Sequence, residues 1–299
     1  MSNLLASLTT PSRSAVVACA LALAACGGAT NETDTTPTDD TGATAPLNVE
    51  TGSVAAAIAG PQRSDENRAR DEWRHPAETL AFFGLEPTMS VIEMSPGGGW
   101  YTEILAPTLR DHGTLTLAQG DPTSNDYARN LMAHLAEHPE VYDQVQTVVF
   151  SPPDAMSLGP DGSADMVLTF RSVHGWVNRN QAQDVFNAMF RVLRPGGVLG
   201  LVQHRASDDA DLAVSAQAGY VPEPAVIQMA TAAGFVLEES SEINRNPADD
   251  HDHPEGVWTL PPTLRMGDTD RATWEAIGES DRMTLRFRRP AAEPEVASN

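Results

Sequence analysis

Short apolar runs alternate with amphipathic segments along most of the chain. Helical spacing of apolar positions is clearest in a segment that begins at Asn178 or Asn180, where Val185, Phe186 and Met189 fall on one stripe. Because strands and helices alternate, the pattern predicts an α/β fold in which helices cover both faces of a seven-stranded, mostly parallel sheet. The apolar runs predict strands at residues 90–94, 113–119, 145–150, 165–170, 198–202, 235–243 and 283–288.

Two further helices are predicted ahead of the first strand. Residues 63–74 are charged and favour a helix, which His75 and Pro76 interrupt. Pro76 suits the first turn of a second helix that runs to Phe83, where Gly84 can serve as the cap. We expect these helices to form an N-terminal cover that leads into the sheet.

The N-terminus has the pattern of a secretion signal. One cation, Arg13, precedes an apolar run at residues 15–25, which is shorter than the roughly 20 residues of a membrane-spanning helix. Leu-Ala-Ala-Cys at residues 23–26 resembles a bacterial lipobox, which implies that Cys26 is diacylated and begins the mature chain. Gly27 after it implies transport to the outer membrane. The alternative is an ordinary cleaved signal or an uncleaved apolar tail.

Composition suggests the domain boundaries. Residues 27–60 are rich in Thr, Asp, Ala, Gly and Pro with almost no large apolar residues, so they predict a disordered tether. We expect one folded domain at residues 61–290 and a disordered tail at 291–299. With a lipoprotein signal at 1–26, this arrangement predicts a periplasm-facing protein held in the cell envelope by its lipid anchor.

The charge and the cysteine content exclude several classes of function. The formal net charge is -22, and all 19 basic residues are Arg. A surface this acidic repels phosphate backbones, so nucleic acid is not an expected partner. Cys19 and Cys26 are the only cysteines and lie in the N-terminal segment. The folded domain therefore has no disulfide, cysteine nucleophile or cysteine metal ligand.

Residues 91–101, Val-Ile-Glu-Met-Ser-Pro-Gly-Gly-Gly-Trp-Tyr, are the stretch around which the chain is organised. From Val91 on, the predicted strand is apolar except for Glu93 near its end. Three glycines and the start of a helix follow it. In parallel α/β sheets, a glycine-rich turn of this kind after a strand is typical of a nucleotide-binding site. A second glycine turn, Leu-Arg-Pro-Gly-Gly at residues 193–197, precedes the fifth strand.

Together, these two motifs and the order of the strands resemble the class I S-adenosylmethionine-dependent methyltransferases, which have a Rossmann-like fold. The resemblance covers about residues 75–290. Trp-Arg-His-Pro, Pro-Gly-Gly-Gly-Trp-Tyr-Thr and Glu-Ser-Asp-Arg-Met at 279–283 are similar to an exported bacterial group of predicted methyltransferases. The resemblance implies S-adenosylmethionine as the cofactor and a small molecule or an envelope component as the methyl acceptor.

The resemblance also implies roles for the glycine stretch. Ser95, Gly97, Gly98 and Gly99 would let the backbone approach the methionyl part of the cofactor, whose carboxylate favours N–H donors. Glu93 occupies the place of the family's acid near this loop, usually Asp, and would orient the cofactor's amino end. Alternatively, Glu93 only ties the loop to its neighbours, because a buried acid needs such partners.

One position departs from the family's pattern. The second strand commonly ends in an acid that accepts hydrogen bonds from both ribose hydroxyls, and here that place is Gln119. Gln119 can accept through its amide oxygen with weaker, neutral bonds, or Asp121 substitutes for it. Asp154, in the loop after the third strand, is the candidate acceptor for the adenine.

Sheet topology places substrate chemistry at the end of the fourth strand. His174 is a candidate general base there, because imidazole titrates near neutral pH, although a lone His is more often a structural hydrogen-bonding group. Arg171 is a candidate for binding the cofactor or an anionic substrate. The alternative for Arg171 is an ion pair within the acidic domain.

A loop at residues 249–255 alternates His and Asp. Imidazole and carboxylate together suit Zn, Mn or Fe, which makes His251 and His253 weak metal candidates. Their spacing matches no closed site, and a solvated acidic loop is the simpler interpretation. Residues 244–280 are expected to be an insertion or lid over the substrate pocket, with Trp258 on its packing side.

Two functions remain open from the sequence. The first is a lipid-anchored methyltransferase that uses S-adenosylmethionine. Because this cofactor is made in the cytoplasm and the signal leads out of it, the second is a non-catalytic lipoprotein that keeps the fold and binds another ligand or a partner. Gln119 favours the second function, and the intact glycine stretch favours the first.

Overall fold

The computed structural model describes residues 46–291. The expected signal peptide, Cys26 and residues 292–299 of the expected tail lie outside the described residues. The strands are β1 (Ser90–Met94), β2 (Thr114–Gln119), β3 (Gln146–Val149), β4 (Ala164–Phe170), β5 (Leu193–Ala206), β6 (Val221–Pro222), β7 (Val236–Ser241) and β8 (Arg282–Arg288). The helices are α1 (Val54–Ala59), α2 (Asp65–Arg68), α3 (Asp71–Arg74), α4 (Pro76–Phe83), α5 (Thr102–Leu109), α6 (Asp126–Glu137), α7 (Pro139–Tyr142), α8 (Val173–Asn178), α9 (Ala182–Val192), α10 (Leu212–Gln217), α11 (Glu223–Ala232) and α12 (Arg271–Ile277), with the 3-10 helix η1 (Gly256–Thr259).

The strands form one mixed sheet in the order β3-β2-β1-β4-β5-β8-β7, and the two-residue β6 pairs with the end of β5. The first five strands are parallel to one another, whereas β8 runs antiparallel to both β5 and β7. This confirms the predicted α/β fold with a mostly parallel sheet. The sheet has eight strands instead of the predicted seven because β6 is too short to leave an apolar run in the sequence.

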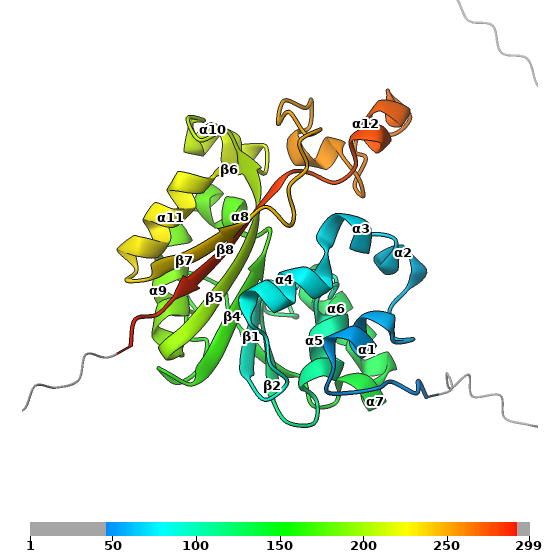
Figure 1. The fold of residues 1–299 in the computed structure, drawn as a ribbon, viewed down its shortest axis with the longest axis vertical. Helices are drawn as coiled ribbons and strands as arrows, with labels where there is room; N and C mark the ends of the chain where they lie inside the picture. Colours follow the sequence, from blue (N-terminus) through cyan, green and yellow to red (C-terminus); the bar gives the residue numbers. More distant parts are fainter. Residues whose placement is uncertain (1–45, 292–299) are drawn as a thin grey trace, which may run out of the picture. The chain divides into compact units, whose positions relative to one another are not determined.

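Helices cover both faces of the sheet (Figure 1). In β1, Ile92 and Met94 face a core that they share with α8, α9 and α11, whereas Val91 faces the core shared with α1, α4 and α5. Successive side chains of a strand point to opposite faces, so a fully apolar strand serves both cores at once. The predicted boundaries of β1 agree with the structure.

Local capping explains where two predicted helices begin and end. Pro76 starts α4, and Gly84 ends it in the left-handed conformation with φ of 75°. The Asn125 side chain caps α6 by accepting from the Ala128 N–H at 3.0 Å. These residues satisfy backbone groups that a helix end would otherwise leave unpaired.

The folded domain begins earlier than the composition indicated. Residues 46–60, assigned above to the tether, include α1, and Ala57 of this helix is fully buried against the core that contains α5. The Gly52 N–H donates to the Pro107 carbonyl at 3.0 Å, and the Leu47 N–H donates to Glu140 Oε1 at 2.9 Å. The few larger apolar side chains of the segment, such as Leu47, Val54 and Ile58, are partly buried against the same core.

Two other boundaries differ from the sequence interpretation. The charged segment at 63–74 forms two short helices, α2 and α3, instead of one. The second glycine turn is the irregular start of β5, where the register with β4 shifts. A Cβ at Gly197 would lie 2.9 Å from the Arg194 carbonyl oxygen, so the chain needs glycine at this bend.

Between β7 and β8 the chain makes a long excursion that contains η1 and α12. It is the orange segment in Figure 1. None of the helices in residues 46–291 is long and apolar enough to cross a membrane.

Candidate functional site

The turn after β1 presents open backbone. Gly97 and Gly99 have positive φ values of 62° and 85°, and the Gly99 N–H donates to the Pro96 carbonyl at 3.0 Å. A Cβ added at Gly97 or Gly98 would meet no atom within 4 Å, whereas one at Gly99 would lie 2.8 Å from Leu131 Cδ1. Gly97 and Gly98 therefore leave room for a ligand, and Gly99 allows α6 to pack against the turn.

Two cavities share this turn as a wall. Their volumes are about 510 Å³ and about 190 Å³. The larger cavity extends to the carboxyl ends of β4 and β5 and to Trp258 of the excursion, and the smaller extends to the end of β2 and the start of α6. The larger is lined by most of the predicted site residues, namely Glu93, Ser95, Gly97, Gly98, Arg171 and His174.

Glu93 is buried between β1 and α5. Its side chain is 2% exposed, and its Oε2 accepts a hydrogen bond from Thr102 Oγ1 at 2.7 Å. Burial raises the pKa of Glu93 to about 7, although the Thr102 hydrogen bond acts in the opposite direction. A cationic ligand group in the cavity would favour the charged form of this carboxyl.

Gln119 ends β2 and lines the smaller cavity. Its side chain is 7% exposed, and among the described residues its Oε1 has no hydrogen-bond donor. A buried acceptor without a donor costs roughly 1–3 kcal/mol. The orphaned oxygen therefore suits a ligand hydroxyl.

Asp121 and Asp154, two predicted ligand acceptors, line neither cavity. Asp121 Oδ1 accepts from the Thr123 N–H at 2.8 Å and from Thr123 Oγ1 at 2.7 Å, so it closes its own turn. Asp154 is exposed in the turn after β3, where its N–H donates to the Ser151 carbonyl at 3.1 Å. Asp after a strand forms such local turns readily, so residue type alone does not mark a ligand contact.

Two imidazoles, His174 and His204, line the larger cavity. The amide of Gln203 orients the first of them. Its Oε1 accepts from the Val173 N–H and its Nε2 donates to the Gly219 carbonyl, both at 3.0 Å. The same Nε2 lies 3.3 Å from His174 Nδ1, which must then accept. Neutral His174 therefore carries its proton on Nε2 and offers a donor, which does not favour the predicted role as a base.

Both imidazoles are held in the neutral form. Burial lowers the pKa of His174 to about 4, and the charge of Arg171 acts in the same direction. Burial also lowers the pKa of His204 well below its usual range, again with a contribution from Arg171. His204 Nδ1 lies 2.5 Å from Ser280 Oγ. The charged guanidinium of Arg171 and the neutral imidazoles of His174 and His204 therefore line the same cavity.

We expect the His174 ring to titrate near pH 4 in the folded chain. An NMR titration of its ring carbon signals would measure this, with the urea-unfolded chain, where His titrates near pH ~6.5, as the control. Because the unfolded chain then binds the proton more tightly, this residue should lower the free energy of unfolding as the pH falls from about 6.5 to about 4. A folded-state midpoint near 6.5 would contradict the buried, neutral ring.

Glu279 is the centre of a buried ionic cluster that the sequence interpretation missed. It is 4% exposed, and its carboxylate oxygens lie 2.6 Å from Arg70 Nε, 3.2 Å from Arg74 Nε and 3.1 Å from Arg282 Nη1. Burial alone would raise the pKa of Glu279, but the three guanidiniums lower it to about 2. We call Arg70, Arg74, Arg171 and Arg282 the arginine group.

The arginine group comes from both ends of the chain. Arg70 and Arg171 line the larger cavity. Arg74 and Arg282 do not line it and share the carboxylate of Glu279 with Arg70. The sequence does show that the segments at 70–74 and 279–282 are rich in charged residues. Their contact across more than two hundred positions was not visible there.

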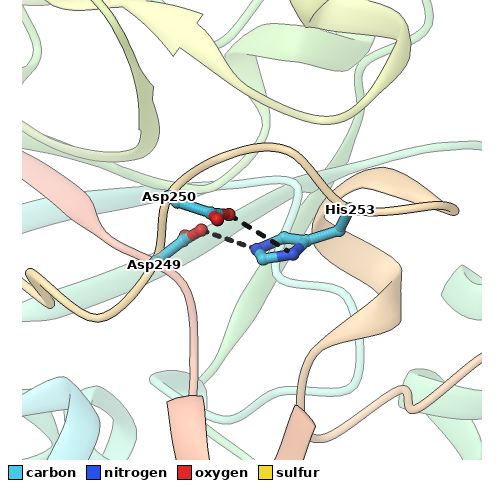
Figure 2. A group of neighbouring side chains, drawn as sticks. All are labelled: Asp249, Asp250 and His253. Carbon is cyan, nitrogen blue, oxygen red and sulfur yellow. Dashed lines mark hydrogen bonds and ion pairs between the residues drawn. The ribbon is translucent and has the colours of Figure 1, made fainter. Parts of the chain in front are cut away.

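The His/Asp loop gathers the side chains of Asp249, Asp250 and His253 (Figure 2). Asp249, Asp250 and His253 place one potential ligand atom each within 4.8 Å of one another. His253 Nε2 is 2.8 Å from Asp249 Oδ1, a separation at which a ring N–H donates to the carboxylate. His251 Nε2 instead faces Asp281 Oδ2 at 3.7 Å. The loop is a hydrogen-bonded structural element in this arrangement.

Known families match the centre of the chain. The model of a methyltransferase domain matches residues 92–201, from the middle of β1 to the middle of β5. No curated protein matches the chain in sequence. The matched part contains Glu93, Gly97, Gly98, Gln119 and Arg171. The arginines at 70, 74 and 282 lie outside it.

Solved structures share the fold at low identity. A SAM dependent methyltransferase from Aquifex aeolicus has a TM-score of 0.52 at 13% identity, covering 75% of this chain and 94% of its own. The 4+2 cyclase SpnF has a TM-score of 0.53 at 18% identity, covering 83% of this chain and 90% of its own. The fold is therefore that of class I methyltransferases. Since one of these structures is a cyclase, the reaction has to be argued from the site.

Proposed function

We propose that this methyltransferase domain binds S-adenosylmethionine across the two cavities and transfers its methyl group to a small molecule or an envelope component. The observation that carries the proposal is the pair of cavities at the open backbone of Gly97 and Gly98. Gln119, with its unpartnered oxygen, lies on one side of this turn, and Glu93 lies on the other.

The residues of the turn suit the parts of this cofactor. Gln119 Oε1 would accept from a ribose hydroxyl, and Glu93 would pair with the ammonium group. The backbone at Gly97 and Gly98 would admit the methionyl chain. The cofactor supplies an electrophilic methyl on a sulfonium, and the protein's part is to bind, orient and exclude water.

Calorimetric titration of the full chain with S-adenosylmethionine and S-adenosylhomocysteine tests the proposal. We expect both to bind. The absence of heat at millimolar ligand would contradict the methyltransferase function. It would then favour a non-catalytic lipoprotein with the same fold, a function that the neutral Gln119 in place of an acid also supports.

Replacing Gln119 with Glu should strengthen the binding of S-adenosylhomocysteine by roughly fivefold, because charge-assisted hydrogen bonds contribute about 1 kcal/mol more than neutral ones. The same change should destabilise the ligand-free chain, since it buries a carboxylate without a donor. Calorimetry and thermal unfolding measure the two effects. Gln119→Ala is the control and should weaken binding. Equal affinity in all three chains would remove Gln119 from the site.

We further propose that Cys26 is diacylated and holds the domain in the cell envelope, with Gly27 favouring the outer membrane. Cys26→Ser should move the chain from the membrane fraction to the soluble fraction, because the acyl chains are lost. Cys19→Ser is the matched control, since Cys19 precedes the cleavage point and should leave the anchor intact. Mass analysis of the mature N-terminus measures the modification directly. An unmodified chain that begins at another residue would contradict the anchor.

A further inference from the structure

The arginine group concentrates positive charge at one end of the larger cavity. Three guanidiniums contact the carboxylate of Glu279 and that of Arg171 lies within its electrostatic influence, in a chain whose formal net charge is -22. Buried charges of one sign repel strongly unless a counter-charge lies among them. The protein has ample acidic residues, yet it places only this one among the four.

Several guanidinium nitrogens in the group have no acceptor. Arg74 is 1% exposed, and its Nη1 and Nη2 are buried without a hydrogen-bond partner among the described residues, as is Nη2 of Arg70. A guanidinium has five N–H donors, and each buried donor left unpaired is unfavourable. Arg70 lines the larger cavity, so an oxyanion there would supply an acceptor for its Nη2 and a counter-charge for the whole group.

Arg171 is the member that faces the cavity without a partner. Within residues 46–291 its guanidinium makes no ion pair and no hydrogen bond, unlike those of the other three. Its backbone is in the left-handed region with φ of 59°, and its N–H donates to the Val202 carbonyl at 2.7 Å. Non-glycine residues held in this conformation are frequent at ligand sites. Burial lowers the pKa of Arg171 to about 10, which still leaves it charged at neutral pH.

The charges that line the larger cavity indicate which ligand group each part suits. Glu93 and the open backbone of the glycine turn suit the ammonium and carboxylate of an amino acid group. Arg171 and the Nε2–H of His174, which line the same cavity, suit an anion. With the amino acid group held at the glycine turn, the arginine group is left for the acceptor.

We propose that the arginine group is an anion subsite, and that Arg171 binds a carboxylate or phosphate group carried by the methyl acceptor. The acceptor is thus a small anion. This inference rests on the proposed function for the identity of the second ligand. Neither the family match nor the fold assigns an anion to this end of the cavity.

Titration of the full chain with inorganic phosphate and with acetate, in a low-salt buffer, tests the subsite without the cofactor. Arg171→Gln should weaken anion binding about tenfold or more, because a charge-assisted hydrogen bond is lost. Arg171→Lys keeps the charge and should retain most of the binding. Arg271→Gln, which removes an exposed arginine paired with Glu275, is the matched control. Unchanged binding in Arg171→Gln, or no binding in the unmodified chain, would overturn the subsite.

A second arm identifies which ligand carries the anion. S-adenosylhomocysteine has an amino acid carboxylate, and 5′-methylthioadenosine lacks it. Arg171→Gln should leave the ratio of their affinities unchanged. A selective loss of S-adenosylhomocysteine binding would show that Arg171 holds the cofactor's carboxylate, and the acceptor assignment would be wrong. Failure of the unmodified chain to bind either nucleoside contradicts the proposed function, while the phosphate titration decides the subsite by itself.

Discussion

Replacing Glu279 with Gln is expected to lower the free energy of unfolding by about 3–5 kcal/mol, because it removes the counter-charge from a buried ion cluster. The carboxylate is within 3.2 Å of nitrogens from Arg70, Arg74 and Arg282. A neutral amide keeps the shape but leaves the guanidiniums repelling one another. Urea unfolding of the two chains at neutral pH measures the difference.

The matched control is Glu275→Gln, which breaks the exposed pair with Arg271 on α12. An exposed pair of this kind contributes about 0.3–0.5 kcal/mol. If Glu279→Gln cost no more than this control, the cluster would not be held together by its one carboxylate.

The difference in unfolding free energy between the unmodified chain and Glu279→Gln should depend on pH. The pKa of Glu279 is about 2 in the folded protein, below its ordinary value of 4.5. The stability that its ionised form contributes is therefore fully present above about pH 4.5 and is lost as the pH falls from there toward 2. The difference between the unmodified chain and Glu279→Gln should narrow over this interval. A difference that stays constant down to pH 3 would contradict the lowered pKa.

Replacing Gly98 with Val is expected to weaken S-adenosylhomocysteine binding by roughly ten- to hundredfold, because the new side chain would occupy space that the ligand needs. A Cβ at this position meets no protein atom within 4 Å, and its φ is not in the left-handed region. The free energy of unfolding should therefore change by no more than about 0.5 kcal/mol. Calorimetry and urea unfolding separate the two effects.

Gly98→Ala is the graded control for this prediction. Its single methyl should weaken binding less than the valine does, and a loss that grows with side-chain volume would show contact with the ligand. Binding of S-adenosylhomocysteine that is unaffected by either change would place the ligand elsewhere. Equal losses of binding and stability would instead indicate a folding defect.

The sheet was predictable because its strands carry a local signal. Residues 90–94 are bounded by turn residues and serve two cores, which requires an uninterrupted apolar run. Residues 46–60 gave no such signal. The few apolar residues of this segment, among them Ala57 and the partly buried Ile58, are mixed with polar residues, Gly and Pro, a composition that is typical of unstructured segments. The break between α2 and α3 likewise depends on contacts with distant residues.

The residues of the candidate site also fall into a group that the sequence made predictable and a group that it did not. Glu93, Gly97, Gly98 and Gln119 were predictable because a strand and its turn fix them within one short segment. The arginine group was not, apart from Arg171, because its members come from separate elements. Charged side chains are also rarely buried, so their sequence pattern indicates a solvated surface. For Asp121 the residue type alone was a poor signal, because its carboxylate closes its own turn and lines neither cavity.

The contact between Arg70 and Glu279 joins residues 209 positions apart. The glycine turn lies well inside the chain and can form while the C-terminal part is still being made, whereas the anion end needs residues from both extremes. Under the proposed anion subsite, recognition of the acceptor therefore depends on residues that the ribosome adds last. A chain cut short before residue 279 would lack Glu279 and Arg282 and also β8, the strand between β5 and β7, so it would lose part of the sheet together with the arginine group.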